Sequence, residues 1–278
     1  MSSSAPDIKH VTLRWSGWTD VGRVRKNNED SFLALEFDAC EVRRLGKAGE
    51  ASTSNADFAF AVSDGMGGAM AGEYASRIAV EKITTLLPRS FHQSAHGLNA
   101  GVNDVLAELF DQIHRALVYV GNSYEECAGM ATTLSLGWFT PGWLYFGHVG
   151  DSRIYYLPAR GGELKQLTAD DTHVGWLLRN RMISEHEART HPRRNVLQKA
   201  LGGDNRFVDA QVGAVAYEPG DTFLFCTDGL TAGLFDHRVI DLLRAPASTG
   251  DGIARQLVEE SVRNDGRDNT TALVIQVF

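Results

Sequence analysis

The chain has 278 residues, of which 43% are hydrophobic, and a formal net charge of −8 with a pI of about 5.6. This length and apolar content suffice for one large domain, and the acidic balance argues against a nucleic-acid-binding surface. No run of about 18 apolar residues predicts a membrane span, and the N-terminus lacks the apolar segment of a secretory signal. The cysteines Cys40, Cys127 and Cys226 have neither zinc-binding spacing nor even pairing, which favours a reducing cytoplasm.

In chain order, the first half predicts strands, a polar connection and two helices. We expect residues 1–10 to form a disordered tail and residues 11–278 a single domain, because no Pro-rich or Gly/Ser-rich linker divides the chain. The expected elements are strands over 15–21, 31–37 and 58–63, a loop or loose hairpin over 38–57, and helices over 72–87 and 100–120. The first helix is expected to end at Pro88, which cannot continue the backbone hydrogen bonds.

The second half of the chain is dominated by strand patterns. They cover residues 131–139, 143–149, 154–157, 210–216, 222–226 and 270–277, with helices predicted near 237–243 and over 252–262. Residues 168–200 break this pattern with short amphipathic pieces rich in Arg and His. Consecutive strands joined by hairpins, with the helices in separate blocks, predict an α+β fold with antiparallel sheets.

Acidic residues recur in Gly-rich or Asn-rich turns along nearly the whole chain. The five turns are Asn27–Asp30, Asp64–Gly68, Gly150–Arg153, Thr227–Gly229 and Arg267–Asn269, and an apolar, β-rich run adjoins four of them. Acids at strand ends can converge on one rim of a sheet core, where clustered carboxylates require cations. Hard divalent metals prefer oxygen ligands, so the pattern predicts a metal-dependent hydrolase.

Each turn also has an ordinary structural interpretation. Asp64 can bridge two metals while Gly65 lets its carbonyl approach them, but an Asp-Gly turn before a helix has the same sequence. Asp228 lies in a second turn of this design, and Asp268 alone is typical turn chemistry. Beside such a site, the guanidinium of Arg25 could bind two phosphate oxygens at once. Without the acids, the simpler interpretation would be a solvated surface charge.

Other catalytic chemistries find no support in the sequence. None of the histidines lies in an acid turn, and His148 falls in a predicted strand, where a hydrogen-bonded core histidine is the simpler interpretation. Neither a Gly-x-Ser-x-Gly nucleophile motif nor a phosphate-binding P-loop occurs.

Taken together and in this order, the motifs resemble those of the metal-dependent serine/threonine protein phosphatases of type 2C, in their compact bacterial form. The resemblance covers roughly residues 15–277 and rests on ordered segments. These are Thr19–Asp30, Val62–Gly68, Gly129–Thr133, His148–Arg153, Cys226–Thr231 and Arg267–Thr270. Each segment is modest alone, but their order makes chance a poor explanation.

The resemblance implies a four-layer α-β-β-α sandwich of two antiparallel sheets flanked by helices, with metals at one end and residues 168–200 as a variable flap beside them. The implied roles are Asp64 as the metal-bridging carboxylate, Gly65 as a carbonyl ligand, Asp228 and Asp268 as ligands of the first metal, Glu29 and Asp30 as holding the second metal or its waters, and Arg25 as binding the substrate phosphate.

The resemblance also implies Mn²⁺ or Mg²⁺, with two core ions and a third left open. Asp151 and Asp228 resemble the carboxylates of the third site, and Asn195 lies near a further ligand position. Ala232 stands where many members carry another acid, which puts this third site in doubt. Met66 stands where animal members have a histidine, so protonation of the leaving group would fall to metal-bound water.

The implied reaction is direct attack of a metal-bridging hydroxide on phosphoserine or phosphothreonine, without a phosphoenzyme. We expect a cytoplasmic monomer that acts on phosphoproteins and opposes a serine/threonine kinase, with no nucleic-acid or membrane partner. Three alternatives stay open: a catalytically silent phosphoprotein-binding domain, a sporulation-type phosphatase, and a metal-dependent small-molecule phosphatase. The arginines of the flap could favour acidic phosphopeptides or form a solvated face; they are Arg179, Arg181, Arg189, Arg193 and Arg194.

Overall fold

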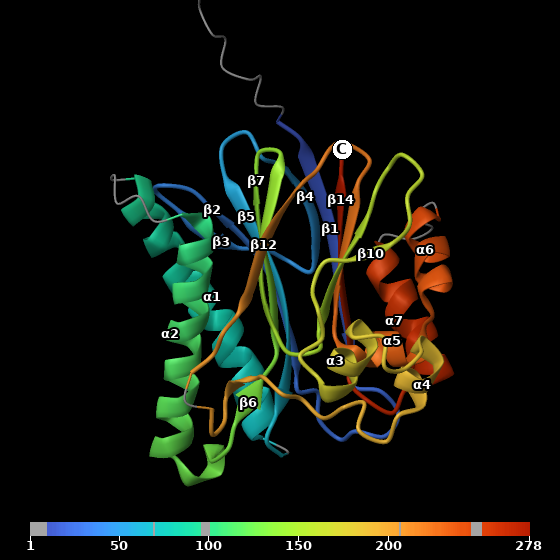
Figure 1. Ribbon diagram of the computed structural model, residues 1–278. Coiled ribbons are helices and arrows are strands. Elements are labelled where there is room, and N and C mark those ends of the chain that lie inside the picture. The colour runs from blue at the N-terminus through green and yellow to red at the C-terminus, as the bar shows by residue number, and fades with distance from the viewer. Residues whose placement is uncertain (1–9, 69, 96–100, 206, 246–251) are drawn as a thin grey trace, which may run out of the picture.

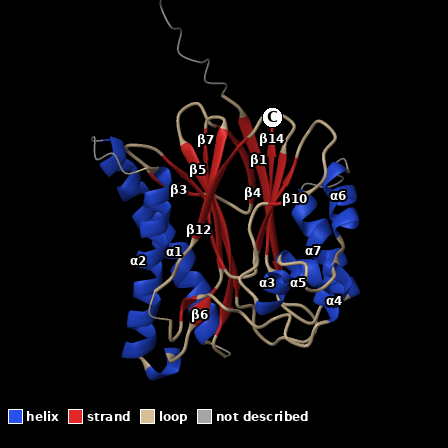
Figure 2. Ribbon diagram, viewed as in Figure 1, coloured by secondary structure: helices blue, strands red, loops and turns tan. Residues whose placement is uncertain are grey.

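Two antiparallel sheets pack face to face in the computed structural model, and helices cover the outer face of each sheet (Figures 1 and 2). The structure describes residues 10–68, 70–95, 101–205, 207–245 and 252–278, with the backbone alone for 89–95. The predicted α+β fold with an α-β-β-α arrangement is therefore confirmed. The tail predicted over residues 1–10 lies, apart from its last residue, outside the described residues.

The first sheet has six strands among the described residues, in the order β10-β9-β13-β14-β1-β4, and all its neighbours are antiparallel. They are β1 (Thr12–Asp20), β4 (Ala48–Ser52), β9 (Arg153–Leu157), β10 (Lys165–Gln166), β13 (Thr222–Cys226) and β14 (Thr270–Val277). Its outer face is covered by α5 (Asp228–Gly233), α6 (Asp236–Arg244) and α7 (Gly252–Asn264). Because β1 pairs with β14, the first and last strands of the chain lie side by side.

The second sheet has eight strands in the described part of the chain. They are β2 (Asp30–Phe37), β3 (Val42–Arg44), β5 (Asp57–Met66), β6 (Ala131–Thr132), β7 (Leu134–Thr140), β8 (Trp143–Val149), β11 (Leu201–Gly202) and β12 (Gln211–Ala216). Its outer face is covered by α1 (Ala71–Ala95) and α2 (Val102–Ser123), which a short 3₁₀ turn (Glu125–Cys127) follows. Both β2 and β7 pair with β5, so β5 lies inside the sheet.

The apolar run of β5 shows how the sequence builds these layers. Phe58, Phe60 and Val62 are fully buried in the core between the two sheets, whereas Ala59 and Ala61 are fully buried under the helices. Side chains alternate between the faces of a strand, so both faces of this strand are covered by apolar layers. The large residues fill the space between the sheets, and the alanines let α1 approach closely.

The structure corrects the expected end of the first helix and the expected loop over residues 38–57. Helix α1 continues through Pro88 to Ala95, because burial of Ile83 and Leu87 in the preceding turns offsets the lost backbone hydrogen bond. The region 38–57, expected to be a loop or loose hairpin, contains two strands that join different sheets, since β3 pairs with β2 and β4 pairs with β1. The pieces expected within 168–200 are helices α3 (His173–Arg179) and α4 (Glu185–Thr190), and we keep the name flap for this range. No described helix has the length and apolarity needed to cross a membrane.

His148 confirms the interpretation as a hydrogen-bonded core residue. Its Nε2 lies 3.0 Å from the carbonyl oxygen of Gly150, and its Nδ1 lies 2.8 Å from Ser135 Oγ. The carbonyl can only accept, so Nε2 carries the proton and Nδ1 accepts from the serine hydroxyl. Complete burial lowers the pKa of His148 from 6.5 to about 4.

We expect His148 to make the fold less stable as the pH falls from 6.5 towards 4. The unfolded imidazole binds a proton near pH 6.5, whereas the folded one stays neutral down to about pH 4. This difference corresponds to about 3 kcal/mol of unfolding free energy. Urea unfolding at pH 7.5, 6 and 5 should show a smaller loss for His148→Gln than for the unchanged chain. Equal losses in the two proteins would contradict the assignment.

Candidate active site

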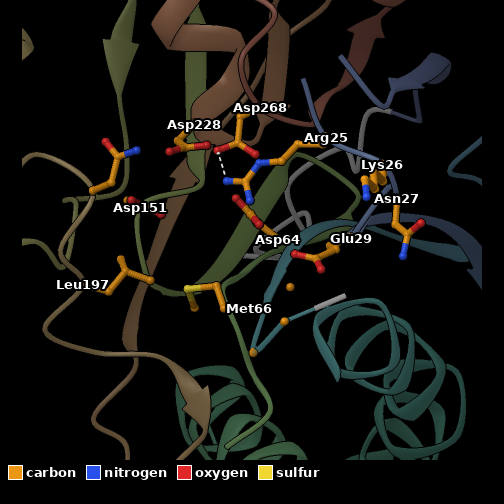
Figure 3. Close-up of a pocket in the computed structure, with 14 residues that line it drawn as sticks. Arg25, Lys26, Asn27, Glu29, Asp64, Met66, Asp151, Leu197, Asp228 and Asp268 are labelled. Carbon is orange, nitrogen blue, oxygen red and sulfur yellow. Dashed lines mark hydrogen bonds and ion pairs between the residues drawn. The ribbon is translucent and has the colours of Figure 1, made fainter. Parts of the chain in front are cut away.

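The acid turns meet at one end of the sandwich, around a cleft of about 390 Å³ (Figure 3). Eight of the nine predicted site residues line it: Arg25, Glu29, Asp64, Gly65, Asp151, Asn195, Asp228 and Asp268. The ninth, Asp30, lies behind the cleft wall, paired in register with Asp64 across β2 and β5. Sequence reasoning therefore identified residues that the fold does bring together, although their individual ligand roles stay predictions.

Asp64 is held by a threonine-containing motif whose role the sequence did not reveal. It lies inside β5, not after it as predicted, because the strand runs to residue 66. Its N–H donates to Thr133 Oγ1 at 3.0 Å, and its carbonyl oxygen accepts from the Thr133 N–H at 2.8 Å. Thr133 Oγ1 also shares a 2.6 Å hydrogen bond with Ser152 Oγ, beside Asp151. These contacts fix Asp64 and Asp151 relative to one another.

The glycines that follow two of the acids are required by close backbone packing. A Cβ atom on Gly65 would lie 1.9 Å from the carbonyl oxygen of Gly72 and 2.9 Å from that of Glu29. A Cβ atom on Gly229 would lie 2.0 Å from the carbonyl oxygen of Asn269. Any side chain at either position would push the strand end and the adjoining helix apart, and with them the walls of the cleft.

Asn269 joins two of the acid turns and was missed as a positioning residue. The N–H of Glu29 donates to Asn269 Oδ1 at 2.8 Å, while Asn269 Nδ2 donates to the carbonyl oxygens of Val21 and Asn27 at 2.9 and 3.0 Å. The buried amide of Asn269 thus ties the turn with Glu29 to its neighbour Asp268. In the sequence, the position of Asn269 directly after Asp268 in a turn was the one indication of this role.

Asp30 is a buried acid whose carboxylate is only half satisfied. Oδ2 accepts hydrogen bonds from the hydroxyls of Thr227 at 2.8 Å and Thr271 at 2.7 Å. Oδ1 of Asp30, like Oδ1 of Asp228, has no hydrogen-bond partner among the described residues. Asp228 itself begins helix α5, where the sequence predicted a turn.

The carboxyl groups of the cleft are harder to ionise than ordinary carboxyl groups. Burial, reinforced by neighbouring carboxylates, raises the pKa of Asp30 to about 7 and that of Asp228 to about 6. The same causes raise the pKa values of Asp64 and Asp151 well above the usual range. Unpartnered, buried carboxylate oxygens of this kind fit divalent cations, which supply charge and coordination together. In the described part of the chain the acids are spread around the cleft, and no three of them are gathered as ligands on one point.

Arg25 is the cation that faces these acids most directly. Its Nη2 donates to Asp268 Oδ2 at 2.8 Å, the contact drawn as a dashed line in Figure 3. Half of its side chain stays exposed, so the remaining guanidinium N–H groups are available to a ligand in the cleft. The predicted contact with a substrate phosphate stays a prediction that this position supports.

Two consecutive acids at the base of the flap clamp the turn that carries Asp151. Arg153 donates to both carboxylate oxygens of Asp170, at 2.9 and 2.6 Å. The N–H of Gly150 donates to Asp171 Oδ2 at 3.1 Å, and the Asp171 N–H donates back to the Gly150 carbonyl at 2.7 Å. Both sides of Asp151 are therefore fastened to the flap, an arrangement that sequence reasoning did not anticipate.

Arg153→Gln should lower the free energy of unfolding by about 2–3 kcal/mol, because it leaves the largely buried carboxylate of Asp170 without its cation. The double variant Arg153→Gln/Asp170→Asn should recover at least half of that loss, since the unpaired charge is then removed. Urea unfolding of the three proteins measures both values. A double variant less stable than Arg153→Gln would show that the pair is not the source of the effect.

Comparison with known proteins gives the family to which this fold and cleft belong. The protein phosphatase 2C family profile matches residues 47–264. The chain is 33% identical over 275 residues to the serine/threonine protein phosphatase PstP of Mycobacterium tuberculosis, a match that covers 96% of this chain and 45% of that protein. The chain thus spans about half the length of this relative.

Solved structures agree with this assignment. The S. agalactiae serine/threonine phosphatase matches with a TM-score of 0.79 and 27% identity, covering 96% of this chain and 100% of that one. The catalytic domain of PstP in complex with two manganese ions matches with a TM-score of 0.74 and 29% identity, covering 97% and 99%. The chain belongs to the protein phosphatase 2C family, and the predictions of family, fold and enzyme class are confirmed.

Proposed function

We propose that the chain removes phosphate from phosphoserine and phosphothreonine in proteins, using Mn²⁺ or Mg²⁺ in the cleft. The observation that carries the proposal is the set of five carboxylates lining one cleft, backed by buried carboxylate oxygens without partners among the described residues. A binding domain without activity would gain nothing from this arrangement and would be destabilised by its charge.

Two core ions would be held by Asp64 with the Gly65 carbonyl, by Asp228 and Asp268, and by Glu29 with Asp30 behind it. A third ion would use Asp151 and Asp228, with Asn195 at the edge of the cleft. Bound divalent ions supply an activated water for attack on phosphorus and neutralise charge on the phosphoryl oxygens. The PstP catalytic domain, solved with two manganese ions, supports the number of core ions.

The protein itself holds the charged side chains around the cleft in fixed positions. The hydroxyls of Thr227 and Thr271 orient the Asp30 carboxylate, and Asp268 orients Arg25 across the cleft. Arg25 then offers its free N–H groups to the phosphate oxygens, where a fixed guanidinium stabilises the charge that develops during transfer. No rearrangement of the backbone is required, since the motifs that carry these residues are already hydrogen-bonded to one another.

The substrates are proposed to be targets of a serine/threonine kinase, and the chain to act as a monomer in the cytoplasm. The name of PstP, a serine/threonine protein phosphatase, supports the substrate class. Cys40, Cys127 and Cys226 are all free thiols, which fits a reducing compartment.

A panel of phosphate esters tests the substrate class. With saturating Mn²⁺, kcat/KM for a phosphothreonine peptide should exceed that for sugar and nucleotide phosphates by at least about tenfold. A preference for a sugar or nucleotide phosphate would instead indicate the small-molecule phosphatase. Failure to hydrolyse any ester in a folded, metal-loaded protein would favour the silent binding domain.

A further inference from the structure

Basic residues lie in or directly next to two segments that line the cleft. Lys26 lines one wall next to Arg25, and Leu197 lies across the cleft from it (Figure 3). Asn195 also lines the cleft, and Arg193 and Arg194 directly precede it in the chain with exposed side chains. We call Lys26, Arg193 and Arg194 the basic rim.

Two of the five flap arginines, Arg179 and Arg189, donate hydrogen bonds to backbone carbonyl oxygens. Arg179 donates to the carbonyl oxygen of Asp170 at 2.7 Å, and Arg189 both donates to the Thr231 carbonyl at 3.3 Å and lies 4.2 Å over the ring of Phe235. Arg189 therefore ties the flap to the region of α5, whereas the contact of Arg179 lies within the flap. By contrast, no side chain of the basic rim forms an ion pair within 4.0 Å of a carboxylate in the described ranges.

Arg194 acts electrostatically on the segment that follows α7. Its charge helps to lower the pKa of Asp265, although the main partner of that carboxylate is Arg267, at 2.6 Å. Arg23 donates to the carbonyl oxygen of Asp265 at 2.8 Å, so the turn with Lys26 is fastened to the same segment. Arg194 of the flap and Arg23 of the turn therefore both interact with the segment at Asp265, although the flap and the turn are far apart in sequence.

Bound ions offset most of the negative charge of the cleft. Five carboxylates line the cleft and Asp30 lies behind its wall, and two divalent ions together with Arg25 carry five positive charges against these six. The basic rim then adds further positive charge beside the cleft. At physiological salt the Debye length is about 8 Å, so these exposed cations act mainly on acids that come within that distance, and added salt weakens the attraction.

We infer that the basic rim selects phosphopeptides that carry Asp or Glu beside the phosphorylated residue, an inference that rests on the proposed phosphatase function. An extended peptide advances about 3.3 Å per residue, so acids two to four positions from the phosphoresidue lie about 7–13 Å from the phosphate. Lys26, adjacent to the phosphate-facing Arg25, is placed for the nearer positions, and the two arginines before Asn195 are placed for the farther ones.

The test compares phosphothreonine peptides of equal length with Glu, Ala or Lys flanks, alongside p-nitrophenyl phosphate, which has no flanks. For the metal-loaded chain, kcat/KM should be about three- to tenfold higher with Glu than with Ala flanks, through a lower KM, and the ratio should shrink with added salt. Arg193→Gln/Arg194→Gln should lose most of this ratio and leave p-nitrophenyl phosphate hydrolysis unchanged. Arg193→Glu/Arg194→Glu should favour the Lys-flanked peptide.

The matched control is Arg160→Gln/Arg244→Gln, which removes the same charge at the opposite end of the sandwich. Arg160 follows the far end of β9, and Arg244 donates to the nearby carbonyl of Gly162. This control should keep the full preference. Equal kcat/KM for Glu-flanked and Ala-flanked peptides, with p-nitrophenyl phosphate still hydrolysed, would overturn the inference and leave the proposed function standing. Hydrolysis of none of the esters would overturn both.

Discussion

Asp64→Asn is expected to reduce metal-dependent phosphate release by about 1,000-fold or more while the chain stays folded. The buried carboxylate of Asp64 interacts electrostatically with those of Asp30, Asp228, Asp151 and Asp268, which places it at the centre of the acid cluster. An amide has the same shape and leaves the backbone hydrogen bonds of residue 64 intact, but it cannot bridge two cations. Initial rates with a phosphothreonine peptide at saturating Mn²⁺ measure the effect.

Asp57→Asn is the matched control for this substitution. Asp57 begins the strand in which Asp64 lies, and its burial raises its pKa to about 6 despite a 2.8 Å hydrogen bond from Trp138 Nε1. It lies at the opposite end of β5, so we expect its amide variant to keep activity within about twofold. More than a tenth of the original rate in Asp64→Asn, or an equal loss in both variants, would contradict a central role of Asp64.

Asp228→Asn should stabilise the metal-free protein and destabilise the metal-loaded protein. At pH 8 the folded carboxylate is ionised although its pKa is raised to about 6, against 3.8 in the unfolded chain. For an acid whose pKa is raised on folding, stability falls as the pH rises from 3.8 to about 6, so at pH 8 the full cost of about 3 kcal/mol is present. The amide removes this cost, and the metal-free variant should be the more stable protein.

With Mn²⁺ the order should reverse. An ion at 1,000 times its dissociation constant stabilises the folded state by about 4.1 kcal/mol for each site, so the loss of even one site that uses the Asp228 carboxylate exceeds the gain of about 3 kcal/mol from the amide. Thermal unfolding at pH 8, once with EDTA and once with Mn²⁺, gives both comparisons. A variant less stable under both conditions would show that Asp228 serves the fold alone.

The acid cluster could be predicted because its members follow strong local patterns. Asp64, Asp228 and Asp268 each adjoin an apolar strand, and strand ends of a layered sheet share a rim. The supporting contacts could not be predicted in the same way. Thr227 and Thr271 reach Asp30 only because strands far apart in the sequence pair with one another. The local hydrophobic pattern of a strand does not determine which residues of another strand it pairs with.

Tertiary packing also overruled local signals elsewhere. Pro88 is a strong helix-ending signal, yet the helix continues because its buried face is anchored on the sheet. The clamp of Asp170 and Asp171 on the turn with Asp151 lies in a segment without regular periodicity, where sequence patterns indicate only a flap. The fold class was thus predictable from strand and helix patterns, whereas the contacts between distant segments required the structure.

The most direct test of a di-metal phosphatase is phosphate release from a phosphothreonine peptide by the metal-stripped chain, titrated with Mn²⁺ and with Mg²⁺. We expect no release in the presence of chelator and a saturable return of activity with either ion, because the buried carboxylates are the ligands that both ions prefer. Release at the same rate with and without chelator, or no release by the folded chain at any ion concentration, would contradict the assignment of the cleft as a metal-dependent active site.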